Sequence, residues 1–194
     1  MRLRVLAALL SLALTSACHS GLDGEVPETP FATQRARQLL AAAGPALEPG
    51  LPTRFSRQGD FLRRVGAETN EPGLPAHAAR PFTVKDDRSG LSLRARLLGA
   101  DGAVQPQAAQ GLLVYPAAFQ GADLWFRATA TGVEDYLLFE RAQPTEVSYE
   151  LELSDEVAGL RLVENTLELL DAHADPRLRL AAPRLFSAGH APVP

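Results

Sequence analysis

Apolar and polar residues alternate along much of the chain after Arg80, which is the pattern of a strand with one buried and one solvated face. The first clear case is segment 91–97, where four apolar residues alternate with three polar ones: Leu91, Ser92, Leu93, Arg94, Ala95, Arg96 and Leu97. Segment 147–153 repeats the pattern, with Val147, Tyr149, Leu151 and Leu153 on one face and Ser148, Glu150 and Glu152 on the other. Both segments are predicted to be half-buried strands.

Six further segments complete the predicted sheet structure. Three are short pairs of alternating leucines, Leu160/Leu162, Leu167/Leu169 and Leu178/Leu180, and three are longer: Leu112–Tyr115, Asp123–Thr129 and Val133–Phe139. The connections "SDEVAG", "EN", "DAHADP" and "TATG" have turn composition, and short connections require antiparallel pairing. We therefore predict a mostly β fold, an antiparallel β-sandwich or strongly bent sheet of about eight short strands. The bulky core candidates are Trp125, Phe126, Tyr136 and Phe139.

The chain before residue 81 lacks this alternation. Segment Thr33–Ala43, "TQRARQLLAAA", predicts one short helix with Thr33 as its N-cap, ending at Gly44-Pro45, whose Leu39 and Leu40 pack on the domain. The following stretch is rich in Pro and Gly, apart from "FLRRV" at Phe61–Val65, which predicts a short strand or turn with a solvated arginine pair. We therefore assign 33–80 to a short helix and a Pro-rich linker, 81–186 to the antiparallel β domain and 187–194 to a C-terminal tail.

The N-terminus has the features of a secretory signal. Arg2 and Arg4 precede an apolar run, Val5–Leu14, that is too short to span a bilayer of about 30 Å. We predict a signal peptide over 1–17 and a tether over 18–32, the latter because "HSGLDGEVPETP" is polar and contains Gly and Pro.

The only cysteine, Cys18, directly follows this apolar run. The segment "LTSAC", Leu14–Cys18, resembles the bacterial lipobox. The resemblance implies cleavage before Cys18 and attachment of acyl chains to its sulfur and its new amino group. It also implies an outer-membrane destination, because His19 stands where the inner-membrane retention signal of such lipoproteins has Asp. Plain secretion is the alternative. In either case, a single cysteine allows no disulfide within the chain.

Charge limits the partners of the chain. The net charge is −4, and cleavage before Cys18 would leave 17 basic and 23 acidic residues. Such an acidic protein does not fit nucleic-acid binding, and it adds no attraction to an anionic membrane. The expected membrane partner is therefore reached through the lipid on Cys18, while any envelope protein or glycan ligand stays unidentified.

Two stretches of the second half carry a further resemblance. They are "VYPAAFQGADLWFRATATGVEDYLLFE", Val114–Glu140, and "GLRLVENTLELLDAHADPRLRLAAPRLF", Gly159–Phe186. They resemble a β-rich N-terminal segment of large bacterial secreted or surface proteins, which continue into YD/Rhs or kelch-like repeats. The shared elements are Tyr115, the Gly121-x-Asp123 turn, Gly132 followed by Glu134, and the "LELLD" and "LRLAAP" strands. The resemblance implies a β-rich fold and transfers no catalytic residue. Because this chain stops at Pro194, where the repeats would follow, it is read as a free-standing copy or a truncated product.

No residue pattern specifies a reaction. Glu150 and Glu152 are spaced like a carboxylate pair of a glycosidase or a cation site, but their alternation with apolar residues accounts for them as a solvated face. Acidic pairs Asp86-Asp87 and Asp171/Asp175 are expected to form turns, and the histidines at 19, 77, 173 and 190 lack zinc-ligand spacing.

We expect no catalytic, cofactor or metal site. The expected function is that of a lipid-anchored envelope protein whose β domain is a structural or binding module. The alternatives are a small envelope hydrolase whose site forms only in three dimensions, and a truncated module of a repeat-containing surface or toxin-delivery protein.

Replacing Cys18 by Ala tests the anchor. The variant should leave the membrane fraction or accumulate as an uncleaved precursor, because the acylated residue is gone. Metabolic labelling with a radioactive fatty acid provides the measurement, and a wild-type protein that takes up no label would contradict the prediction.

Overall fold

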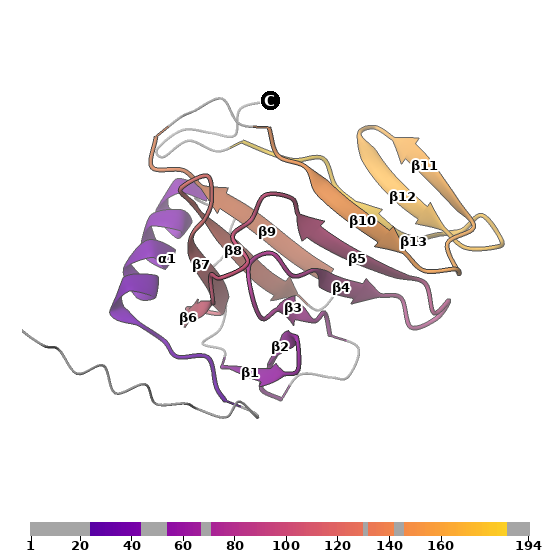
Figure 1. Cartoon of the computed structure of the whole chain (residues 1–194). Coiled ribbons are helices and arrows are strands. Elements are labelled where there is room, and N and C mark those ends of the chain that lie inside the picture. Colours follow the sequence, from indigo (N-terminus) through magenta and orange to yellow (C-terminus); the bar gives the residue numbers. More distant parts are fainter. Residues whose placement is uncertain (1–23, 44–53, 67–70, 130–131, 142–145, 186–194) are drawn as a thin grey trace, which may run out of the picture.

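The computed structural model describes residues 24–43, 54–66, 71–129, 132–141 and 146–185. Within them the chain forms one helix and thirteen strands in four antiparallel sheets (Figure 1). This confirms the mostly β class with a short N-terminal helix. The elements are α1 (Pro30–Ala43), β1 (Phe55–Gln58), β2 (Phe61–Arg64), β3 (Leu74–Pro75), β4 (Phe82–Lys85), β5 (Ser92–Leu97), β6 (Gln107–Ala109), β7 (Leu112–Phe119), β8 (Ala122–Thr129), β9 (Gly132–Leu138), β10 (Tyr149–Leu153), β11 (Gly159–Val163), β12 (Thr166–Leu170) and β13 (Pro176–Leu180).

All eight predicted strands are present, as β5 and β7–β13. The predicted total of about eight is too low. The additional strands are β1–β3, β4 and β6, none longer than four residues. Of these, β2 lies within Phe61–Val65, where the sequence predicts a short strand or turn. Strands this short carry too few residues to display a period of two, which is why alternation did not reveal them.

In the four-stranded sheet β6-β7-β8-β9, the central strands β7 and β8 are buried on both faces, while β9 is half-buried. One face carries Val114 and Trp125, which pack against α1, and the other carries Tyr115 and Phe126, which belong to the largest hydrophobic cluster. Strand β8 is buried along five consecutive residues, as expected for a strand covered on both sides. Trp125 and Phe126 are core residues as predicted, while Tyr136 and Phe139 are partly buried at its border.

Helix α1 begins at Pro30, three residues before the predicted start. The Thr29 hydroxyl accepts a hydrogen bond from the Ala32 N–H at 3.1 Å, so Thr29 is the N-cap, and Pro30 occupies the first helical position, where its missing N–H costs nothing. Thr33 as N-cap is therefore wrong. Ala32, Ala36 and Leu39 on the buried face of α1 belong to one hydrophobic cluster with Trp125, which confirms that the helix packs on the domain.

The opposite face of this sheet is covered partly by β1–β3. Phe55, Leu62 and Leu74 of these strands are fully buried in the same cluster as Tyr115 and Phe126. The assignment of this region to a Pro-rich linker outside the domain is therefore wrong. Arg63 and Arg64 are not a solvated pair either, because Arg63 donates to the Glu71 carbonyl at 2.6 Å and Arg64 binds the Glu71 carboxylate.

Part of the predicted tether also belongs to the domain. Val26 donates a backbone hydrogen bond to Phe55 at 2.9 Å, and Ala108 donates one to Pro27 at 3.0 Å. Val26 also packs against the largest cluster. Residues 25–28 are thus paired with the domain through their backbone and do not form a free linker, despite their polar composition. The first part of the predicted tether, residues 18–23, lies outside the described residues.

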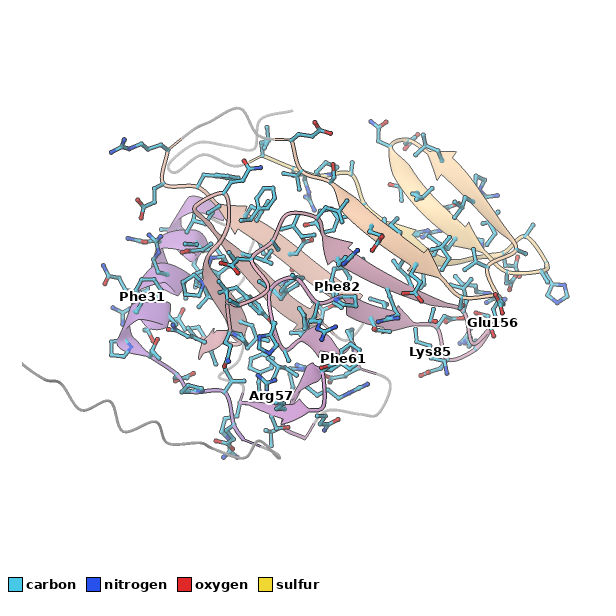
Figure 2. The ribbon with its side chains drawn as sticks, in the orientation of Figure 1. Phe31, Arg57, Phe61, Phe82, Lys85 and Glu156 are labelled. Carbon is cyan, nitrogen blue, oxygen red and sulfur yellow. The ribbon has the colours of Figure 1, made fainter. Side chains whose placement is uncertain are left out.

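The sheet β10-β5-β4 connects two hydrophobic clusters through one apolar face. Leu97 of β5, Phe82 of β4 and Tyr149 of β10 contact the largest cluster, where Phe82 packs edge-on against Phe126 at 5.5 Å between ring centroids. Leu91, Leu93, Leu151 and Leu153 extend the same face toward the sheet β11-β12-β13, where they surround Leu169. Figure 2 shows Phe82, which is partly buried, toward the middle of the molecule and Lys85, at the other end of β4, beside Glu156. The β5 and β10 alternation is thus confirmed.

A buried ion pair joins α1, β7 and β8. The Asp123 side chain is 2% exposed, and its carboxylate accepts from Arg35 Nε at 2.7 Å and from the Ala117 N–H at 2.8 Å. Ala117 lies where β7 bulges and has a positive φ of 50°. Arg35 also contacts the exposed Glu140 at 3.0 Å. Asp123 therefore fixes both the helix and the bulge to β8.

Replacing Asp123 by Ala should lower the free energy of unfolding by about 3 kcal/mol, because Arg35 and the Ala117 N–H lose their buried acceptor. The matched control is Glu140→Gln, which removes the exposed partner of the same arginine and should cost less than about 1 kcal/mol. Urea denaturation followed by Trp125 fluorescence measures both variants. If both variants lost the same free energy of unfolding, the buried position of Asp123 would contribute nothing to stability beyond an exposed ion pair.

Candidate functional site

The candidate site is the free edge of β11. One edge of this strand pairs with β12, with Leu160 opposite Leu169, Arg161 opposite Glu168 and Leu162 opposite Leu167. Glu164 and Asn165 form the connecting turn, as expected from the turn composition of "EN", and both have positive φ values, 47° and 65°. No strand among the described residues pairs with the other edge. In Figure 1, β11 lies at the end of the molecule far from α1.

Both the apolar face and the backbone of β11 are accessible. Two rows of leucines cross the sheet, Leu160-Leu169-Leu178 and Leu162-Leu167-Leu180. Leu169 is fully buried under β5 and β10, whereas Leu160 is 54% exposed and Leu162 is 70% exposed. The covering layer therefore ends at β12. The predicted strand at β11 is confirmed, but its apolar face, which was expected to be buried, is exposed to solvent.

The opposite face of the same strand is basic at its centre. Arg161 donates to Glu168 at 2.8 Å and 2.6 Å, and Arg179 of β13 donates to the other oxygen of Glu168 at 2.9 Å. The hydrogen bond from Arg161, with that from Arg179, holds the pKa of Glu168 below its usual range. The row Arg179-Glu168-Arg161 thus ends in an arginine at the free edge.

This arrangement can extend the sheet by one strand. An unpaired edge offers backbone N–H and C=O groups, and edges of this kind recruit extended segments from other chains. Folded proteins usually cover an edge or protect it with charges. Here β11 carries one charge, Arg161, on one face, while Leu160 and Leu162 expose apolar surface on the other. The site is therefore suited to binding an extended polypeptide segment.

The residues singled out in the sequence lie elsewhere. Glu150 and Glu152 occupy the exposed face of β10, as predicted, and each pairs with the arginine directly opposite on β5, Arg96 and Arg94. Each carboxylate is thus balanced by its own guanidinium. Cys18 lies outside the described residues.

The acidic turn residues behave as predicted. Asp171 accepts from the N–H groups of His173 at 2.9 Å and Asp175 at 3.1 Å, and Asp86 accepts from the Ser89 hydroxyl at 2.7 Å. Within the described part of the chain, no group of three or more His, Cys, Asp or Glu side chains is arranged to hold a metal ion. The described residues likewise contain no helix long and apolar enough to cross a membrane.

A shallow hollow lies at the start of α1 and is lined by Glu28, Thr29, Pro30, Thr33, Gln34 and Arg37. Its two charged lining residues, Glu28 and Arg37, have opposite signs, so it does not favour a charged ligand. Comparison with protein-family models, with curated proteins and with solved structures finds no match to this chain. Its function is therefore inferred from its own geometry.

Sequence reasoning missed Asp135, a partly buried acid on β9. It lies between Val133 and Leu137, which pack on the largest cluster, and it accepts a hydrogen bond from the Tyr149 hydroxyl of β10. Burial raises the pKa of Asp135 above its ordinary value of 3.8, although the Tyr149 hydrogen bond opposes the shift. Burial likewise raises the pKa of Tyr149, and the neighbouring Asp135 adds to this shift. The pair joins two sheets and faces no described cavity, so we assign it to the core.

Asp135 generates a pH-dependent prediction. Because its folded-state pKa is raised, its contribution to stability is greatest below pH 3.8 and decreases as pH rises through the folded pKa. Asp135→Asn keeps an acceptor for Tyr149, so it should be more stable than wild type at neutral pH, with the difference disappearing in acid. Urea titrations from pH 3 to 8 measure this, with the exposed Asp155→Asn as control, expected to change stability by less than about 0.5 kcal/mol. A constant difference between Asp135→Asn and wild type across this range would contradict the assignment.

Proposed function

We propose that this chain is a lipid-anchored extracytoplasmic protein of the bacterial envelope, whose β domain binds another protein through the free edge of β11. The observation that supports binding is the combination on one strand of an unpaired edge with the exposed Leu160 and Leu162. Contiguous apolar surface of this kind marks interaction sites in folded proteins.

The anchor accounts for how such a module acts. Cys18 carries the acyl chains, and each buried methylene contributes about 0.8 kcal/mol, so several chains hold the protein permanently at the membrane, which is proposed to be the outer one. Confinement to a surface raises the effective concentration of the module toward a partner in the same membrane. A weak edge-strand contact is then sufficient for association.

The partner strand continues the sheet in this proposal. Its backbone hydrogen-bonds to β11, which supplies affinity, while alternate side chains contact Leu160 and Leu162 on one face and Arg161 on the other, which supplies selectivity.

Site-specific photo-crosslinking in membranes tests the surface. A benzoyl-phenylalanine placed at Leu162 should give one adduct of defined mass on irradiation, and the additional change Leu160→Lys should abolish it. The matched control position is Leu98, another exposed leucine, which lies just after β5 and should give no adduct. Equal adducts from both positions, or none from Leu162, would contradict the proposal.

A further inference from the structure

We propose that the occupant of the β11 edge is an extended segment of a different protein in which one acidic residue is flanked by two apolar residues. This rests on the proposed function, that β11 is a binding edge, and it names the chemistry of the partner. The argument depends on the residues that β11 presents at its free side and on the row of charges that ends there.

The internal partner of β11 shows which sequence complements this strand. Leu160, Arg161 and Leu162 stand opposite Leu169, Glu168 and Leu167 of β12. Side chains of a central strand interact with neighbours on both sides, at Cβ separations of about 4.5–5.5 Å for directly opposed residues. A strand added to the free edge therefore meets the same three side chains, and a second apolar-acidic-apolar sequence complements them.

The charges favour an acid at the central position. Across the polar face, Glu168 is shared between Arg161 and Arg179, so one carboxylate serves two guanidinium groups. The Arg161 side chain, at the outer end of this row, is 49% exposed. An acidic residue opposite Arg161 would extend the row to alternating charges, whereas a basic residue would place like charges directly opposite each other.

The flanking positions favour apolar residues. Leu160 and Leu162 point to the same face as Leu167 and Leu169, but the layer that covers these two does not extend over β11. Apolar residues on the partner strand lie beside Leu160 and Leu162 and remove their surface from water. The apolar rows would then extend by one residue each.

A second copy of this chain is a poorer occupant. Antiparallel pairing that joins all five residues of one β11 to all five of another places Arg161 opposite Arg161. Moving the centre to Leu162 avoids this pair but places Leu160 opposite Glu164 and pairs fewer strand residues. Full pairing with a second copy therefore lacks the acid opposite Arg161 that an acidic-centred segment supplies.

Fluorescence anisotropy with defined peptides tests the inference on the full chain in detergent. The probe is fluorescein-labelled Gly-Ser-Thr-Leu-Glu-Leu-Thr-Ser-Gly-amide, and the matched control peptide has Lys in place of Glu. The Glu peptide should bind at least about fivefold more tightly than the Lys peptide, because the central residue faces Arg161.

Protein variants assign the preference to β11. Arg161→Gln should abolish the difference between the two peptides, and Arg161→Glu should reverse it. Leu162→Lys should prevent binding of both peptides, whereas Leu98→Lys should not affect them. Trp125 emission confirms that each variant is folded, and Arg161→Gln supplies the test if Arg161→Glu does not fold.

The outcomes separate this inference from the proposed function. Equal binding of the two peptides, or a preference unchanged in Arg161→Gln, overturns the acidic partner while an adduct at position 162 still supports the binding edge. Failure of both peptides to bind also overturns the inference. An adduct at position 162 with twice the mass of the chain identifies a second copy as the occupant and overturns it as well.

Discussion

Strand β5 contributes a single apolar face to two hydrophobic clusters, and the arrangement of the other sheets depends on it. Leu97 joins the cluster beneath sheet β6–β9, while Leu93 and Leu91, the residue just before β5, join the cluster beneath sheet β11–β13. A slip of one residue in its pairing would turn Arg94 and Arg96 inward and all four apolar residues outward. The ion pairs of these arginines with Glu152 and Glu150 of β10 favour the observed register from the solvated side.

The second half of the fold was predictable because its signal is local. Strands such as β5, β10 and β12 alternate over five or six residues, and the turn at Glu164-Asn165 has residues suited to positive φ. The first half of the fold was not predictable from such a signal, because Phe55, Leu62 and Leu74 are isolated apolar residues in a Pro- and Gly-rich stretch. Their burial is explained only by their packing in one cluster with Tyr115 and Phe126. The start of α1 at Pro30 did have a local signal, a threonine followed by proline, which was overlooked in favour of Thr33.

The candidate site was not predictable for a different reason. The leucine pairs of β11, β12 and β13 have the same alternation in the sequence, yet Leu162 is exposed and Leu169 is buried. Alternation reports which residues share a face and does not report whether another layer covers that face. The Arg35–Asp123 ion pair was hidden similarly, since 88 residues separate its partners and neither has a local pattern. Tertiary contacts that join distant segments thus decide both the core and the surface that remains free.

The backbone pairing of residues 25–28 with β1 and β6 has a consequence for orientation. The predicted tether of fifteen residues is reduced to the few that separate Cys18 from Gly24, with a contour length of about 20 Å. An anchor on Cys18 would therefore keep the side of the molecule that carries β1 close to the bilayer. Strand β11 lies at the far end from α1 and away from β1 (Figure 1). With so short a connection between Cys18 and Gly24, the free edge of β11 would lie on the side of the molecule away from the bilayer and would face the aqueous space.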